Sequence, residues 1–307
     1  MPLIECVPNV SEGRRVDVIA ALRASLTAPD VHVLDQSSDP SHNRTVYTFA
    51  GEAGPLQDAV LRLFATAIDA IDLRSHDGVH PRMGAVDVVP FIPLHGATME
   101  ECVALARSTG TLVAERFAIP VFLYEDAAAN DERRSLSEIR RGGANGVALR
   151  MKQSSWRADF GPDAPHTTAG ATAIGARPIL IAYNVNLASN RLGVARRVAS
   201  VVRASGGGLP HVKALGMQLD HGVVQVSMNL TNYKETPMTT VFDAVTREAA
   251  ADGVRVLESE IVGLVPADAL PPDPARRLKL RAADLDKVLE KRLTATIANE
   301  GRKPNSE

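Results

Sequence analysis

The chain has 307 residues, with 34 basic and 36 acidic side chains and a formal net charge of −2. This balance argues against a general nucleic-acid or anionic-membrane surface, while a local charged cluster can still bind a small ligand. The length is sufficient for two packed units, because domains commonly contain about 100–150 residues. Cys6 and Cys102 are too few for a disulfide framework, so we expect buried thiols in a reducing compartment.

The N-terminal residues M-P-L-I-E-C lack the basic and apolar segments of a signal peptide. No apolar run approaches the roughly 20 residues that a membrane-spanning helix requires. We therefore expect a soluble, cytoplasmic protein.

Hydrophobic periodicity predicts the element order βαββαβ at the start of the chain. The expected elements are a strand at 2–8, a helix at 14–26, strands at 31–34 and 45–49 around the polar loop 35–44, a helix at 54–71 and a strand at 85–92. Thr98 and Glu101 fit a capping box that starts a helix reaching 117, and a strand at 119–124 follows. Residues 125–170 predict one short helix at 135–141; such a long connection is usually functional or covers something.

The same element order is predicted again from residue 177 onward. The expected elements are a strand at 179–186, a helix at 190–205, a hairpin of strands 214–220 and 223–230 with a turn at His221 and Gly222, a helix from Pro237 to 251 and a strand at 254–262. Leucines predict a further helix at 275–298. The fold class is thus α+β, with two ferredoxin-like subdomains and a substrate groove between them, divided into residues 1–177, 178–270 and a linker, helix and tail at 271–307.

The segment 76–93 carries the most chemistry, because it joins histidine, aspartate, arginine and glycine residues to an apolar strand. His76 and His80 are four residues apart, as in a helical metal site, but Gly78 and Pro81 disfavour a helix there. We therefore expect no metal. His80 is suited to acid–base catalysis by its near-neutral pKa, and the loop containing Asp39, His42 and Arg44 is expected to converge with this segment.

Two other patterns are weaker. Gly170 and Gly175 have the glycine spacing of a nucleotide loop without the Lys-Ser/Thr pair that should follow, although small residues there would let a flat ligand approach the backbone. Ser11, Ser41 and Ser227 lie outside any G-x-S-x-G motif, which argues against an ordinary serine hydrolase.

Several segments together resemble the glutamate formimidoyltransferase family over about residues 3–270. They are E-C-V-P-N-V-S-E-G (5–13), S-H-N-R-T-V-Y-T-F (41–49), G-V-H-P-R-M-G-A-V-D-V-V-P-F-I-P (78–93), D-F-G-P (159–162), G-A-T-A-I-G-A-R (170–177), Y-N-V-N-L (183–187), Q-V-S-M-N-L (225–230) and V-G-L-V-P (262–266). The chain is too short to add the cyclodeaminase domain of the mammalian enzyme. It therefore resembles the stand-alone form.

The resemblance implies transfer of the formimino group from N-formimino-L-glutamate to nitrogen 5 of tetrahydrofolate, a step of histidine degradation. It also implies two α/β subdomains that form a folate groove, and it makes His80 the catalytic residue. Both substrates carry carboxylates, which arginine forks bind well. The expected substrate- and folate-binding residues are Asp39, Asn43, Arg44, Arg82, Asp159, Phe160, Gly161, Pro162, Gly170 and Gly175.

Asp39 or Asp77 is expected to orient the histidine. His42 and His166 occupy positions without a histidine in the mammalian enzyme, so each is interpreted as a solvated loop residue. The expected partners are the two substrates, with tetrahydrofolate as co-substrate and a second subunit in a homodimer, and no nucleic acid or membrane. Two alternatives remain, namely a related folate enzyme that uses 5-formyltetrahydrofolate and a non-catalytic folate-binding module.

Overall fold

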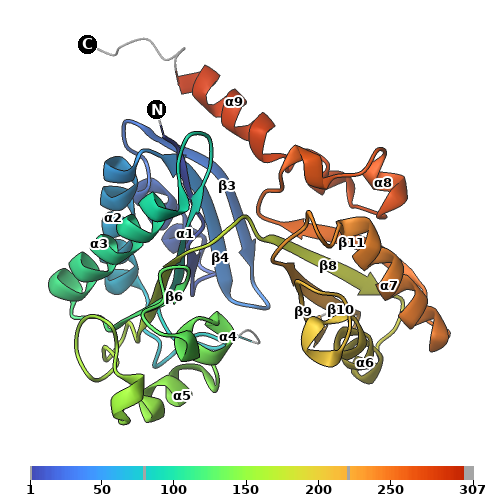
Figure 1. The fold of residues 1–307 in the computed structure, drawn as a ribbon, viewed down its shortest axis with the longest axis horizontal. Coiled ribbons are helices and arrows are strands. Elements are labelled where there is room, and N and C mark those ends of the chain that lie inside the picture. Colours follow the sequence, from blue (N-terminus) through green and yellow to red (C-terminus); the bar gives the residue numbers. More distant parts are fainter. Residues whose placement is uncertain (1, 79–80, 220–221, 301–307) are drawn as a thin grey trace. The chain divides into compact units, whose positions relative to one another are not determined.

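A computed structural model describes residues 2–78, 81–219 and 222–300. The chain forms two compact units, residues 1–177 and 178–307 (Figure 1). Each unit has its own sheet and its own hydrophobic core. The mixed α+β class with two α/β units is as predicted. Across the described ranges, no helix is long and apolar enough to cross a membrane.

The sheet of the first unit contains the βαββαβ order predicted for its beginning. β3 (Val31–Asp39) pairs with β4 (Arg44–Gly51), and the short strands β1 (Ile4–Cys6) and β2 (Asn9–Val10) together fill the place between β4 and β5 (Val86–Pro93). β7 (Thr172–Ala176) and β6 (Val121–Glu125) extend the sheet in parallel beyond β5. The polar segment predicted as a loop at 35–44 is mostly strand, because residues 35–39 and Arg44 continue the β3–β4 ladder with side chains that alternate between more and less exposed positions along β3.

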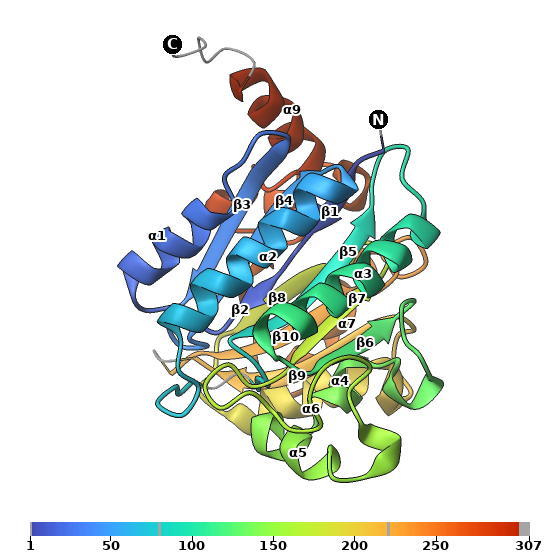
Figure 2. The ribbon, with the colours of Figure 1, turned by 90° about the vertical axis from the view of Figure 1, so that its left-hand side faces the viewer.

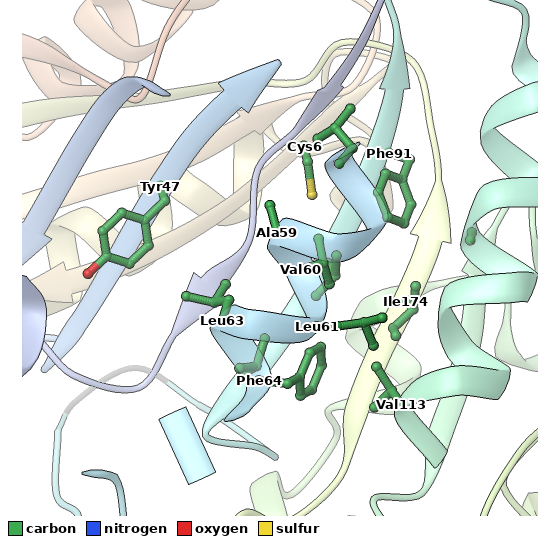
Figure 3. Close-up of a cluster of buried hydrophobic side chains, with 14 of the residues drawn as sticks. Cys6, Tyr47, Ala59, Val60, Leu61, Leu63, Phe64, Phe91, Val113 and Ile174 are labelled. Atoms are coloured by element: carbon green, nitrogen blue, oxygen red, sulfur yellow. The ribbon is translucent and has the colours of Figure 1, made fainter. Parts of the chain in front are cut away.

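Three helices cover one face of this sheet, as Figure 2 shows for α1 (Val16–Ser25), α2 (Ala53–Ala70) and α3 (Met99–Phe117). Alternate residues of the strands point to opposite faces. Phe91 and Ile174 therefore pack with Leu63 and Phe64 of α2 in the main core (Figure 3), whereas Phe122 and Ala173 face a smaller cluster. The smaller cluster also contains side chains of α4 (Leu136–Ile139) and α5 (Gly143–Arg150).

Among the described residues of the first unit, the helix α5 and the strand β7 were not predicted, and β2 lies beyond the strand predicted at 2–8. One short helix was expected at 135–141, but Gly142 has a φ of +78° and separates α4 from the additional helix α5. The buried strand β7 was interpreted only as a run of small residues. Gly175 lies within it, where an added Cβ atom would lie 2.4 Å from the carbonyl oxygen of Tyr124. The small side chains thus allow close packing of neighbouring strands.

The second unit is an antiparallel sheet with the order β11–β8–β10–β9. Its elements follow the predicted βαββαβ order, with β8 (Ile181–Leu187), α6 (Leu192–Val202), β9 (Val212–Gln218), β10 (Val224–Leu230), α7 (Met238–Ala251) and β11 (Val256–Val262). Pro237 precedes α7 as its N-cap residue instead of occupying the first helical position. The predicted turn at His221 falls partly outside the described residues.

The single helix predicted at 275–298 is wrong. The structure has a short α8 (Pro274–Arg277) and a separate α9 (Leu289–Glu300), with an extended segment and a 3₁₀ turn between them. Lys279 has a φ of +50°, and its carbonyl accepts a hydrogen bond from Ser259 of β11. Leu278 and Leu289 are both buried, but Leu278 follows α8 and Leu289 begins α9. Their spacing therefore does not mark one face of a single helix.

The predicted capping box of α3 is confirmed. The hydroxyl of Thr98 accepts from the backbone N–H of Glu101, and the Glu101 carboxylate accepts from the backbone N–H of Thr98 at 2.8 Å.

Thr98→Ala should therefore lower the free energy of unfolding by about 0.5–2 kcal/mol in urea denaturation. Thr111→Ala, within the same helix, is the control and should change it by less than about 0.5 kcal/mol. Equal effects of the two substitutions would contradict the role of the cap.

Candidate active site

The predicted convergence of two loops is present in the described part of the first unit. Residues 40–43 form the turn between β3 and β4, and Asn43 adopts a left-handed φ of +48°. The amide of Asn43 donates to the carbonyl of Asp77 at 2.9 Å, and its side-chain oxygen accepts from the backbone N–H of Gly13 at 2.9 Å. Asn43 thus ties the turn to the segment 76–83 and to the segment before α1.

Two glycines allow this close approach. An added Cβ atom at Gly78 would lie 2.6 Å from the carbonyl oxygen of His42 and 2.5 Å from the guanidinium of Arg82. At Gly13 it would lie 2.3 Å from the carbonyl oxygen of Asp39. Real Cβ atoms do not tolerate such distances, so the packing requires glycine at both positions. His80 lies outside the described residues, between Gly78 and Arg82.

Asp39 and His42 form a close pair in the turn. The Nδ1 atom of His42 lies 2.6 Å from the Asp39 carboxylate, whose other oxygen accepts from the backbone N–H groups of Ser41 and His42. Burial raises the pKa of Asp39, but these hydrogen bonds and the charge of His42 outweigh it, so the pKa is lowered overall. Among the described histidines, the one that the Asp39 carboxylate contacts is His42. The interpretation of His42 as a solvated loop residue is wrong, because its side chain is only 14% exposed.

His76 contacts Arg82 within the predicted catalytic segment. Nη1 of Arg82 faces Nδ1 of His76. Burial lowers the pKa of His76, and the charge of Arg82 lowers it further. Asp77 instead pairs with Arg14 at 2.7 Å on the surface. A cavity of about 330 Å³ adjoins this segment and includes His76, Asn43 and Arg14 in its lining.

A buried carboxylate, which the sequence analysis missed, lies among the predicted arginines. Asp87 is 2% exposed, accepts from the backbone N–H of Met83 at 2.7 Å and pairs with Arg140. Its charge acts on both Arg44 and Arg82. The pKa of Arg44 is lowered to about 10, because burial and the charge of Arg140 lower it more than the charges of Asp87 and Asp39 raise it. Arg140 thus contacts the buried carboxylate directly, and Arg44 and Arg82 lie close enough for its charge to act on them.

A signal for Asp87 was present in the sequence, because it is the single charged residue within the apolar run V-D-V-V-P-F-I-P. A buried charge in a strand needs partners, and its presence there predicts an ion pair. Arg140 carried no such signal. It follows the four-residue helix α4 and comes near Asp87 only through the fold.

The predicted folate-lining residues occupy two places. Gly170 has a φ of +71° and packs against Met83, where an added Cβ atom would lie 2.2 Å from the Met83 carbonyl oxygen. Asp159 and Phe160 lie instead along the outer edge of β6, separated from β4 by β2, β5, β7 and β6. Neighbouring strands are about 4.8 Å apart, so roughly 24 Å of sheet separates this segment from Arg44. Gly161 and Pro162 continue the same edge segment.

Asp159 has a local structural partner. It forms an ion pair with Arg133 at 2.8 Å, and both side chains are at most 8% exposed. Its second oxygen accepts from the backbone N–H of Leu123. His166 likewise has a local role, because its Nδ1 atom accepts from the backbone N–H of Ala169 at 3.1 Å within a tight turn. No group of three or more metal-ligating side chains occurs among the described residues.

Comparison with known protein families assigns the chain to one family. The N-terminal subdomain of the formiminotransferase domain matches residues 3–177, and the formiminotransferase domain matches residues 182–276. The chain belongs to the formiminotransferase family. The resemblance predicted from the sequence motifs is thus confirmed.

Relatives in this family include proteins of similar length. The chain is 44% identical over 297 residues to a glutamate formimidoyltransferase of Thermoplasma acidophilum, covering 95% of this chain and 98% of that protein. It is 42% identical over 270 residues to a glutamate formimidoyltransferase of Streptococcus pyogenes serotype M1, covering 87% and 90%. The formimidoyltransferase-cyclodeaminase of Sus scrofa is 44% identical, but the match covers only 51% of that protein.

Glu12, within the family segment 5–13, provides a test of how the site is held. Its carboxylate is 3% exposed and accepts from the backbone N–H groups of Arg14 and Arg15 and from the Arg15 guanidinium. Burial raises the pKa of Glu12, but the three hydrogen bonds and the charge of Arg15 lower it below 4.5 overall. A carboxylate whose pKa is lower in the folded than in the unfolded state stabilises the folded state when the pH is above the unfolded-state pKa. This stabilisation is lost as the pH falls through the folded-state pKa.

Glu12→Gln should therefore lower the free energy of unfolding by about 1.5–3 kcal/mol near pH 7. The difference from the unmodified chain should shrink as the pH falls from about 6 to about 3, measured by urea denaturation at each pH. Glu115→Gln, at an exposed position of α3, serves as the control and should have little effect. A difference for Glu12→Gln that is constant across this range would contradict the electrostatic explanation.

Proposed function

We propose that the chain transfers the formimino group from N-formimino-L-glutamate to nitrogen 5 of tetrahydrofolate, giving 5-formimidoyltetrahydrofolate and L-glutamate. The main support is the similarity to two glutamate formimidoyltransferases over at least 87% of this chain and at least 90% of each relative. The arginines around Asp87 add chemical support, because both substrates carry carboxylates. Tetrahydrofolate is a co-substrate in this reaction, and no metal is required.

The reaction needs a group that both accepts and donates a proton. Nitrogen 5 of tetrahydrofolate attacks the formimino carbon and forms a tetrahedral intermediate, and nitrogen 5 then loses its proton. The bond from that carbon to the glutamate nitrogen breaks, and the departing nitrogen gains a proton. One histidine can take the first proton and deliver it to the leaving nitrogen, which conserves protons over the cycle. We assign this role to His80.

The described neighbours of His80 fit this assignment. Gly78 packs closely against the carbonyl of His42 and the guanidinium of Arg82, and Asn43 donates to the carbonyl of Asp77, so the described residues just before His80 are held by packing as well as by a hydrogen bond. Positioning of this kind contributes to catalysis by aligning the reacting atoms. Arg44 and Arg82 are proposed to bind substrate carboxylates, and Asp39 or Asp77 to orient the histidine.

Other predicted features remain proposals. Asn43, Gly170, Gly175 and the segment from Asp159 to Pro162 are proposed to bind or line the folate, in a groove between two ferredoxin-like subdomains. A step in histidine degradation, a cytoplasmic location and a homodimer are expected from the family resemblance and the composition.

Replacement of His80 tests the proposed mechanism directly. His80→Ala should lower kcat for formimino transfer by about 10²–10⁴-fold, because the proton transfers lose their catalyst. Its thermal unfolding midpoint should stay close to that of the unmodified chain. His95→Ala, at an exposed loop position, is the control and should retain full turnover. Turnover of His80→Ala close to that of the unmodified chain would contradict the assignment.

The assay also separates the proposed function from its alternatives. The unmodified chain is incubated in parallel with formiminoglutamate plus tetrahydrofolate and with 5-formyltetrahydrofolate plus glutamate. We expect rapid product formation with the first pair. Product from the second pair alone would identify a different folate enzyme, and folate binding without product from either pair would identify a binding module.

A further inference from the structure

Arg140 is the arginine of this site that neither the family motifs nor sequence proximity indicated. We propose that Arg140, oriented by Asp87, is a further binding residue for a carboxylate of one of the two substrates. The inference rests on the proposed function, because that function supplies the carboxylate ligands. It adds the residue that follows α4 to a group whose other arginines, Arg44 and Arg82, come from the first half of the unit.

Asp87 holds the guanidinium of Arg140 in one orientation. One oxygen of Asp87 accepts from the backbone N–H of Met83, which ends the segment containing His80, and the other oxygen accepts from Nη2 of Arg140. Because the carboxylate is fixed at both oxygens, it fixes the position of the arginine fork relative to that segment. A preformed fork loses little conformational freedom when it binds an anion.

The Arg140 guanidinium has unused donor capacity. Its side chain is 13% exposed, and no hydrogen-bond acceptor among the described residues reaches its buried Nε atom. A guanidinium has five N–H donors, and a buried donor without an acceptor is unfavourable. A carboxylate bound at the exposed part of the Arg140 side chain would form the charge-assisted hydrogen bonds that arginine favours.

Arg133 provides a useful comparison. Its Nε atom is also buried without an acceptor, but its other two nitrogens bind Asp159 and the carbonyl oxygen of Arg157. Arg133 therefore belongs to a locally complete ion pair. Arg140 differs because it lies close enough to Arg44 for its charge to lower the Arg44 pKa.

The charges around Asp87 favour an anionic ligand. Asp87 pairs with Arg140 and its charge also acts on Arg44 and Arg82, so three guanidinium groups lie within the electrostatic reach of one buried carboxylate. Asp39 acts on Arg44 from the neighbouring turn but is itself bonded to His42 and to backbone N–H groups. Positive charge thus exceeds negative charge among these groups, and a substrate carboxylate would reduce the repulsion.

Steady-state kinetics of Arg140→Gln test the proposal. We expect KM for either formiminoglutamate or tetrahydrofolate to rise about 10-fold or more, because a charge-assisted hydrogen bond is lost. We expect kcat to change less than about threefold, since Arg140 binds substrate without moving a proton. The neighbouring Arg141→Gln is the matched control, because Arg141 is 70% exposed and pairs with Glu138, and it should leave both KM values unchanged.

Two further variants separate binding from folding. Arg140→Lys keeps a positive charge beside Asp87 but lacks the guanidinium fork, so it should fold and still raise the same KM at least about threefold. Asp87→Asn should raise that KM as well, and its effect should be less than additive with Arg140→Gln because both changes disrupt one unit. Unchanged KM values for both substrates in Arg140→Lys and in folded Arg140→Gln would overturn the proposal.

Calorimetry with 5-formyltetrahydrofolate and with L-glutamate separates this inference from the proposed function. An unmodified chain without turnover would contradict the function alone. In that case Arg140→Gln should still weaken the binding of one of these ligands about 10-fold relative to Arg141→Gln. Equal affinities of the two variants for both ligands would overturn the role of Arg140.

Discussion

The candidate active site depends on the buried carboxylate of Asp87. A carboxylate in an apolar strand is costly unless its oxygens are hydrogen-bonded and its charge is paired. Met83 and Arg140 meet these requirements from two different parts of the chain. The same carboxylate therefore bonds to the backbone of Met83 and holds the guanidinium of Arg140. A core interaction of this kind links Met83 to Arg140, in addition to any contribution to stability.

Close backbone packing complements this ion pair. Gly13 and Gly78 let the turn after β3 and the segment before β5 approach until their backbones touch, and Asn43 then joins them through both ends of its amide. The sheet brings these segments together, because β4 and β5 both flank β2. Catalytic groups on loops thereby gain positions defined by rigid strands.

Much of this arrangement was predictable from local sequence, and the exceptions have physical causes. The Thr98 capping box and the alternating core strands depend on neighbouring residues, so sequence patterns predicted them well. The leucines from Leu278 onward matched a helical period, yet the chain there includes an extended segment that pairs with β11. Leu278 and Leu280 are buried beside that pairing without forming a helical face. The pairing of Asp87 with Arg140 spans 53 positions, and no local pattern reports such a contact. Motif resemblance identified the family and the loop, whereas Arg140 required the three-dimensional fold.

The most direct test of this account is a crystal structure of the chain with 5-formyltetrahydrofolate and L-glutamate bound. The account predicts a ligand carboxylate within hydrogen-bonding distance of at least one guanidinium among Arg44, Arg82 and Arg140, and the 5-formyl group beside the imidazole of His80. Asp87 should remain bonded to Met83 and Arg140. Ligands bound in the same crystal with their carboxylates away from all three arginines, and with the formyl group distant from His80, would contradict the account.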